Sequence, residues 1–168
     1  SSDVFGFDKV SEDKVKAAEK IYNGNMEMQM LFRSMETCGK PFVAAINGHA
    51  LGGGFEICLS CHYRVAIDND KIQIGQPEAK VGLIPGAGGT QRVPRLAGVT
   101  QEIMGFLLAG TPLAPKKALA AGLINEVVDE KDLIDAAKKY IIDGGKAVQP
   151  WDEKGYKFPG GLPYTPKG

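Results

Sequence analysis

Apolar residues follow two alternating patterns along this chain. In the first pattern they recur at the three- and four-residue spacing of one helical face, at Met28, Leu31, Phe32 and Met35. In the second pattern, residues 42–46 form a short apolar run typical of a buried strand. The Gly-Lys-Pro sequence at 39–41 is expected to end the helix, and Asn-Gly-Asn at 23–25 to break it.

The same alternation continues to about residue 147. Short strands are predicted at 63–67 and 72–74 around the polar turn 68–70, after a helix that runs from the glycine run at 52–54 to about Cys61. Further helices are predicted at 90–97, 101–109, 115–121 and 130–142, with Pro115 at a first helical position and Gly144 as a C-terminal cap. From Val148 onward helical periodicity is lost, which predicts a linker or a docked tail. This order of elements favours the α/β class.

The glycine run Gly52-Gly53-Gly54 is the strongest chemical signal. Glycine allows a ligand carbonyl to approach the backbone, and the first N–H groups of a helix are unpaired donors at its positive end. Glu56 follows within one turn, and Glu78 lies on a later loop after Pro77. Together they predict an oxyanion hole with two carboxylates that share acid and base work.

Each of these residues also has a structural interpretation. The glycines could form only a tight turn, and Glu56 could be favoured by the helix dipole alone, by about 0.3–1 kcal/mol. Glu78 could be an ordinary surface residue. Taken one at a time, the structural interpretation is the stronger one.

Two longer stretches decide between these interpretations. Residues 40–56, and residues 74–78 with 82–92, resemble the enoyl-CoA hydratase/isomerase (crotonase) superfamily, and the likeness extends from about residue 26 to residue 146. The nearest resemblance is to the hydratase portion of multifunctional fatty-acid oxidation alpha chains. It implies a spiral of strand–strand–helix repeats with C-terminal helices, a domain at 1–146, and a linker or docked tail at 147–168. The chain begins Ser1-Ser2-Asp3, and no Gly-Ala-Asp-type motif precedes Ser11, so we expect the N-terminal part of the fold to be missing.

The resemblance implies a role for each site residue. Gly53 matches the glycine whose N–H polarises the thioester carbonyl. Glu56 matches the glutamate that activates water, and Glu78 the one that exchanges a proton with C2. The residues that would line the substrate pocket are Gly52, Gly54, Pro85 and Gly86. The implied activity is enoyl-CoA hydratase of β-oxidation; isomerase activity, which in the family relies mainly on the Glu78 equivalent, stays open. The alternative is a non-catalytic module that binds acyl-CoA or holds an assembly together.

The resemblance also implies cofactors and partners. Hydration needs no metal or redox cofactor, and NAD would matter only if a dehydrogenase domain follows in a longer parent chain. The expected partners are acyl-CoA, further copies of the chain in a trimer-based oligomer, or a thiolase in a β-oxidation complex.

Charge, hydropathy and cysteine content argue against several classes of protein. The formal net charge is zero, so neither nucleic acid nor an anionic membrane surface is indicated. No apolar run is long enough to span a bilayer, no signal segment is visible, and the three cysteines suggest no disulfide framework, so we expect a cytoplasmic protein.

Two short motifs invite other interpretations. Cys58-Leu59-Ser60-Cys61-His62 matches the pattern for covalent haem attachment, but buried structural cysteines fit better, and a zinc site would need a second cysteine pair. The glycine-rich stretch 86–90 lacks the Lys-Ser/Thr pair of a phosphate loop, so a tight turn at a helix start is expected. Lys80, Lys116 and Lys117 could meet CoA phosphates, although solvated lysines are the simpler interpretation.

Overall fold

The computed structural model describes residues 14–161, which form a mixed α/β fold. The N-terminal half contains α1 (Lys14–Thr37), β1 (Val43–Ile46), β2 (Ala50–Leu51), α2 (Gly53–Ser60), β3 (Tyr63–Ile67), β4 (Ile74–Gly75) and the 3-10 helix η3 (Pro77–Val81). The C-terminal half contains α3 (Gly89–Ala97), α4 (Gln101–Leu108), α5 (Pro115–Ala120), β5 (Glu126–Val128), η4 (Glu130–Asp132), α6 (Leu133–Ile142) and η5 (Pro150–Asp152). The segment before Ser11, which bears on the expected loss of N-terminal structure, lies outside the described residues.

Two small parallel sheets organise the chain. One has the strand order β1-β3-β5, and the other pairs β2 with β4. A strand of the first sheet, a strand of the second and then helical structure follow one another twice along the chain, which is the strand–strand–helix repeat that was predicted. The predicted strand at 63–67 is confirmed, whereas the one predicted at 72–74 forms at Ile74–Gly75. β2 and β5 were not predicted.

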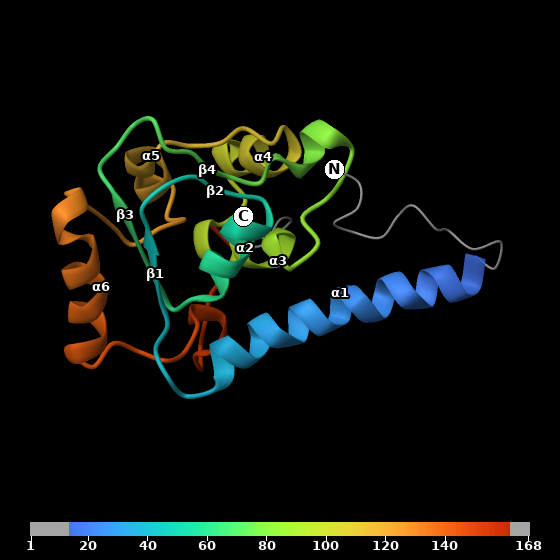
Figure 1. The fold of residues 1–168 in the computed structure, drawn as a ribbon, viewed down its shortest axis with the longest axis horizontal. Helices are drawn as coiled ribbons and strands as arrows, with labels where there is room; N and C mark the ends of the chain where they lie inside the picture. The colour runs from blue at the N-terminus through green and yellow to red at the C-terminus, as the bar shows by residue number, and fades with distance from the viewer. Residues whose placement is uncertain (1–13, 162–168) are drawn as a thin grey trace.

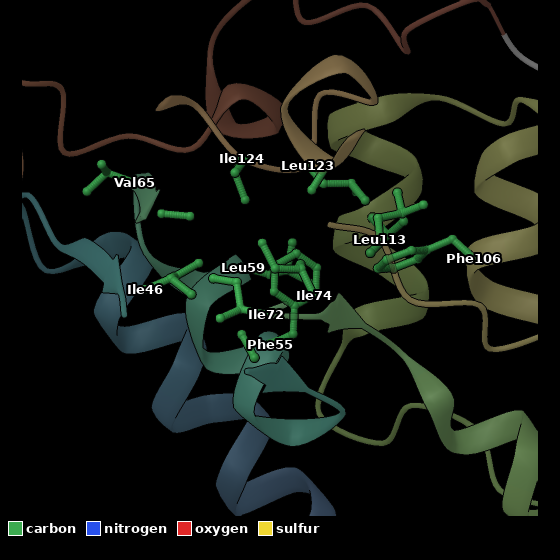
Figure 2. Close-up of a cluster of buried hydrophobic side chains, with 14 of the residues drawn as sticks. Ile46, Phe55, Leu59, Val65, Ile72, Ile74, Phe106, Leu113, Leu123 and Ile124 are labelled. Atoms are coloured by element: carbon green, nitrogen blue, oxygen red, sulfur yellow. The ribbon is translucent and has the colours of Figure 1, made fainter. Parts of the chain in front are cut away.

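The core lies between the sheets and α2, α4 and α5. Figure 2 shows Phe55 and Leu59 of α2 pointing toward Ile72 and Ile74, with Phe106 and Leu113 beside them. Phe55 is fully buried and meets Phe106 edge to face, with ring centroids 6.0 Å apart. Burial of each such side chain contributes roughly 1.5–3 kcal/mol, so the inner face of α2 is fixed in place. The glycine run stands at the N-terminal end of this helix.

The long helix α1 departs from prediction in two ways. It continues through Asn23-Gly24-Asn25, where a break was predicted, because one exposed glycine costs a helix only about 1 kcal/mol. The apolar face expected there is also buried only in part: Phe32 is buried and Met35 half-buried, whereas Met28 and Leu31 are 47% and 60% exposed and Glu36 takes a buried position. In Figure 1 its N-terminal part extends away from the rest of the fold.

The residues after α6 pack against the body of the fold. Gln149 is fully buried, and its Nε2 atom donates to the carbonyls of Ser60 and Cys61, both at 3.1 Å. Tyr156 donates its hydroxyl to the Arg95 carbonyl at 2.7 Å. Through residue 161, therefore, the chain beyond α6 is docked.

None of the helices within residues 14–161 has the length and apolar character needed to cross a membrane.

Candidate functional site

The glycine run forms the N-terminus of α2. Gly52 is the N-cap residue with φ +55° and ψ −131°, a conformation that favours glycine, and the helix begins at Gly53. Gly53 and Gly54 are solvent-exposed, and within the described part of the chain neither N–H has a hydrogen-bond acceptor. Two free donors therefore point outward at the positive end of a helix whose inner face is buried.

Sheet pairing brings Glu78 to this helix end. Gly52 donates its N–H to the Gly75 carbonyl at 2.9 Å, which fixes β2 beside β4. Glu78 then follows three residues after Gly75, on η3 rather than on the loop that was predicted. Its Oε1 lies 3.0 Å from where a Cβ of residue 52 would stand, so the absence of a side chain at Gly52 lets the carboxylate approach.

Glu56 lies one turn into α2 and is almost fully buried, with 2% of its side chain exposed. Its Oε1 accepts from the N–H of Ala87 at 2.8 Å and from the N–H of Gly89 at 2.7 Å. Its Oε2 has no hydrogen-bond partner among the described residues. The carboxylate is thus held through one oxygen while the other stays available to a ligand or water.

The side-chain amide of Gln76 lies between the two carboxylates. Assigned from its hydrogen bonds, the amide nitrogen faces Glu78 and donates to both carboxylate oxygens at 3.1 Å. Gln76 is fully buried, and the same amide lies 2.9 Å from where a Cβ of residue 89 would stand, with Glu56 Oε1 3.1 Å from that position. One buried side chain therefore contacts the surroundings of both glutamates.

The environment of Glu78 raises the pKa of its carboxyl group. Burial is the main cause that raises the pKa of this carboxyl above its ordinary value, and the negative charge of Glu56 adds to the increase. A hydrogen bond from the Glu78 backbone acts in the opposite direction without cancelling it. The pair thus combines a carboxyl group of raised pKa with a second carboxyl group that accepts two backbone hydrogen bonds.

The remaining predicted site residues are Pro85 and Gly86, in the loop before Ala87, and Gly54 in α2. Pro85 is buried and Gly86 exposed in the loop that leads to Ala87, and Gln29 of α1 donates to the Gly86 carbonyl at 3.1 Å. Gly54 instead lines a cavity of about 340 Å³ between β1 and α2, together with Met35, Ala44, Asn47, His49, Ile57 and Cys58. Neither glutamate lines that cavity, so Gly54 has contacts that are separate from the carboxylate pair.

The haem interpretation is disfavoured by the contacts of His62. Its Nδ1 accepts from the Phe42 N–H at 3.0 Å, and its Nε2 is 3.1 Å from the Glu36 carbonyl. Both ring nitrogens are therefore engaged by backbone groups and neither is free to ligate iron. Cys61 is buried, and Cys58 is partly buried with its Sγ donating to the Gly54 carbonyl at 3.2 Å.

The glycine-rich stretch 86–90 forms the start of α3, as predicted. Gly88 is the N-cap residue with φ +102°, and its neighbours Ala87 and Gly89 turn their N–H groups toward Glu56. These donors are thus occupied by a carboxylate of the protein. Of the lysines considered for CoA phosphates, Lys116 pairs with Asp68 at 2.8 Å.

Sequence analysis missed three components of this site: the Gln76 amide and the N–H groups of Ala87 and Gly89. The hydrogen bonds of a backbone N–H depend on the fold and not on the residue type. Gln76 stood inside a recognised motif, but nothing in the sequence marked it as a site residue. Its role follows from the burial of its side chain, which one sequence does not reveal.

Comparisons with known proteins identify the family of this chain. Residues 5–143 match the family described as enoyl-CoA hydratase/isomerase. The fatty acid oxidation complex subunit alpha of Shewanella baltica is 40% identical over 147 residues, which cover 88% of this chain and 21% of that protein. Its counterpart in Idiomarina loihiensis is 48% identical over 114 residues, or 68% of this chain and 16% of that protein. The chain thus spans between about a sixth and a fifth of the length of these relatives.

Solved structures show the same fold. The enoyl-CoA hydratase of Bacillus anthracis has a TM-score of 0.65 at 33% identity and covers 80% of this chain and 48% of its own. DspI of Pseudomonas aeruginosa has a TM-score of 0.66 at 34% identity, over 80% of this chain and 52% of its own. Since the family match spans most of the chain and structural relatives share its α/β architecture, the chain belongs to the enoyl-CoA hydratase/isomerase family of the crotonase superfamily.

Proposed function

We propose that this chain carries the hydratase site of an enzyme of fatty-acid β-oxidation, which adds water across a trans-2-enoyl-CoA to give the 3-hydroxyacyl-CoA. The observation that carries the proposal is the meeting of Glu56 and Glu78 around Gln76, beside the free N–H groups of Gly53 and Gly54. Acid, base and carbonyl-polarising donors then lie at one helix end. Hydration of an unsaturated thioester requires these three components.

In the proposed reaction the carboxylate of Glu56 takes a proton from water as the water oxygen bonds to C3. The carboxyl of Glu78 gives its proton to C2, and the C2–C3 double bond becomes a single bond. A proton then returns from Glu56 to Glu78, through solvent or the next water, so the enzyme is restored. The raised pKa of Glu78 supports its role as the proton donor, and two backbone hydrogen bonds hold the Glu56 carboxyl group in position.

Charge that develops on the thioester oxygen needs a donor in a fixed position. The N–H of Gly53 supports this role because it is exposed and has no acceptor in the described part of the chain. A fixed donor of this type commonly lowers a barrier by about 3 kcal/mol. We propose that Gly52, Pro85 and Gly86 line the pocket around the acyl thioester beside the carboxylates, and that Gly54 contacts the substrate from the side of the cavity between β1 and α2.

The experiment that tests this proposal follows loss of the enoyl-thioester absorbance of crotonyl-CoA. The unmodified chain should turn over, and Glu78→Gln should reduce turnover by at least about 100-fold because general acid catalysis commonly contributes that much. Glu27→Gln, at an exposed position of α1, is the matched control and should behave as the unmodified chain. Equal turnover by Glu78→Gln and its parent would refute the assignment of Glu78.

CoA-thioester binding without turnover would instead favour the non-catalytic module. Binding is measured by calorimetry with a non-hydratable acyl-CoA, which separates loss of chemistry from loss of the site. The names of the Shewanella and Idiomarina relatives support a place within a larger fatty acid oxidation complex. We propose that context for the parent protein, with a 3-hydroxyacyl-CoA dehydrogenase domain and its NAD in the same chain, and a thiolase partner.

A further inference from the structure

A buried ion pair lies directly behind the loop that holds Glu56. Arg92 of α3 donates from Nε to Glu36 Oε1 of α1 at 2.6 Å, with only 10% and 2% of the two side chains exposed. The guanidinium also lies over the Phe32 ring, 6.0 Å from its centroid. Two charges removed from water in this way require full pairing, so the position of the guanidinium is narrowly defined.

The same guanidinium reaches the loop itself. Arg92 Nη1 donates to the Ala87 carbonyl at 2.9 Å, while the Ala87 N–H donates to Glu56 on the other side. Ala87 is therefore held at both of its backbone polar groups. Gly88 allows this arrangement, because a Cβ at that position would overlap Arg92 Nη1.

The ion pair continues outward through Arg33, which donates to Glu36 Oε2 at 2.9 Å and to both carboxylate oxygens of Asp152 at 2.7 Å. Arg33 is 40% exposed and makes no bond to the loop 85–89. The outer pairs thus share Glu36 with the inner pair but do not contact the peptide groups that hold Glu56. Arg33 therefore provides a control for Arg92.

We propose that Arg92, held in place by Glu36, is a positioning residue for Glu56: it fixes the Ala87 carbonyl so that the Ala87 and Gly89 N–H groups converge on the Glu56 carboxylate. Its effect on turnover rests on the proposed hydratase function, whereas its effect on the loop does not. Loss of the guanidinium frees the Ala87–Gly88 peptide to rotate. Glu56 Oε1 then loses the fixed geometry of its two donors.

The first measurement is amide hydrogen exchange of Ala87 and Gly89, which requires no activity. In the double variant Glu36→Leu/Arg92→Met no buried charge is left unpaired, so the fold is retained. Exchange of both amides should accelerate by about 10- to 100-fold relative to that of the buried strand residue Val65, because each loses a charge-assisted hydrogen bond. Arg92→Lys keeps the charge but cannot satisfy both partners, so it should accelerate the same amides. Arg33→Met should leave them unchanged.

The second measurement is hydration of crotonyl-CoA by the same variants. The double variant should lower kcat by about 10- to 100-fold with little change in KM, since a small misplacement of a catalytic group has an effect of this size. Unchanged amide exchange in the folded double variant would overturn the positioning role, whatever the turnover. Accelerated exchange in a protein whose parent shows no hydration would support the positioning role and refute the proposed function instead.

Discussion

A methyl group added at Gly89 tests how tightly Glu56 is held. The Cβ of Gly89→Ala would stand 2.9 Å from the Gln76 amide and 3.1 Å from Glu56 Oε1, both closer than ordinary van der Waals contact. Each neighbour must move by a few tenths of an ångström. Because the Gln76 and Glu56 side chains are fully or almost fully buried, the displacement falls on the carboxylate and its hydrogen bonds rather than on solvent-exposed groups.

The magnitude follows from the contacts. Overpacking a buried site costs about 1–3 kcal/mol, and here the lower end applies because two side-chain ends, and no backbone atoms, must move. The hydrogen bond from the Gly89 N–H to Glu56, at 2.7 Å, is charge-assisted and contributes roughly 1.5–3 kcal/mol when its geometry is intact. Weakening it in the transition state should lower kcat by about 10- to 100-fold.

Urea unfolding and crotonyl-CoA hydration measure the two effects separately. The matched control is Gly105→Ala in α4, where a Cβ meets nothing within 4 Å, and this variant should be more stable by up to about 1 kcal/mol with unchanged kcat. A Gly89→Ala variant that keeps the parental kcat would refute the inference that Glu56 has no room to move. A loss of several kcal/mol in stability with normal kcat would show that the backbone, and not the carboxylate, absorbs the strain.

Three further predictions concern titration, thiol reactivity and the core. The carboxyl carbon of Glu78, followed by NMR, should titrate with a pKa above the ordinary value of 4.5, and Glu56→Gln should lower that pKa because it removes a neighbouring negative charge. Since the folded state holds this proton more tightly than the unfolded state, the resulting stabilisation is present at low pH and is lost as pH rises through the folded pKa. A titration midpoint that does not move in the variant would contradict the coupling between the two carboxyl groups. Iodoacetamide at pH 8 should alkylate exposed Cys38 well before Cys58, whose pKa burial raises to about 11, and peptide mass spectrometry that finds Cys58 modified first would contradict the structure. Phe55→Ala should lower the free energy of unfolding by about 3–5 kcal/mol in urea titration, and a loss below about 1 kcal/mol would place Phe55 outside the core.

Most helices and the strands β1 and β3 were predictable because their apolar spacing matches their burial. The strand at Tyr63–Ile67 is apolar except for Arg64, and its last four residues are buried, so the apolar pattern matches the burial. β5 has three half-buried residues and exists because Val65, Ala66 and Ile67 supply its partners from a distant part of the chain. Such a strand depends on tertiary pairing and leaves little trace in local sequence.

The site was predictable in part for the same reason. Gly53, Glu56 and Glu78 stand in motifs that resemble a known family, and the structure brings Glu78 to the start of the helix that carries the other two. The apolar face expected on α1 is only partly buried, since helical spacing was counted over apolar residues alone: Phe32 is buried, but Met28 and Leu31 are exposed. Glu36 takes a core position that hydrophobicity assigns to an apolar residue, and its buried partner Arg92, 56 positions away, together with Arg33 explains why.

The α2 helix depends on distant parts of the chain at both of its ends. Its first turn lies against η3, and its last carbonyls are covered by the single side chain of Gln149, almost ninety positions later. A protein shortened at residue 146, where the sequence alone suggests a boundary, would therefore expose the end of the helix that carries Glu56. Any attempt to excise, fuse or permute this unit should keep the segment through Tyr156 attached, because Gln149 in that segment satisfies the carbonyls at the end of α2.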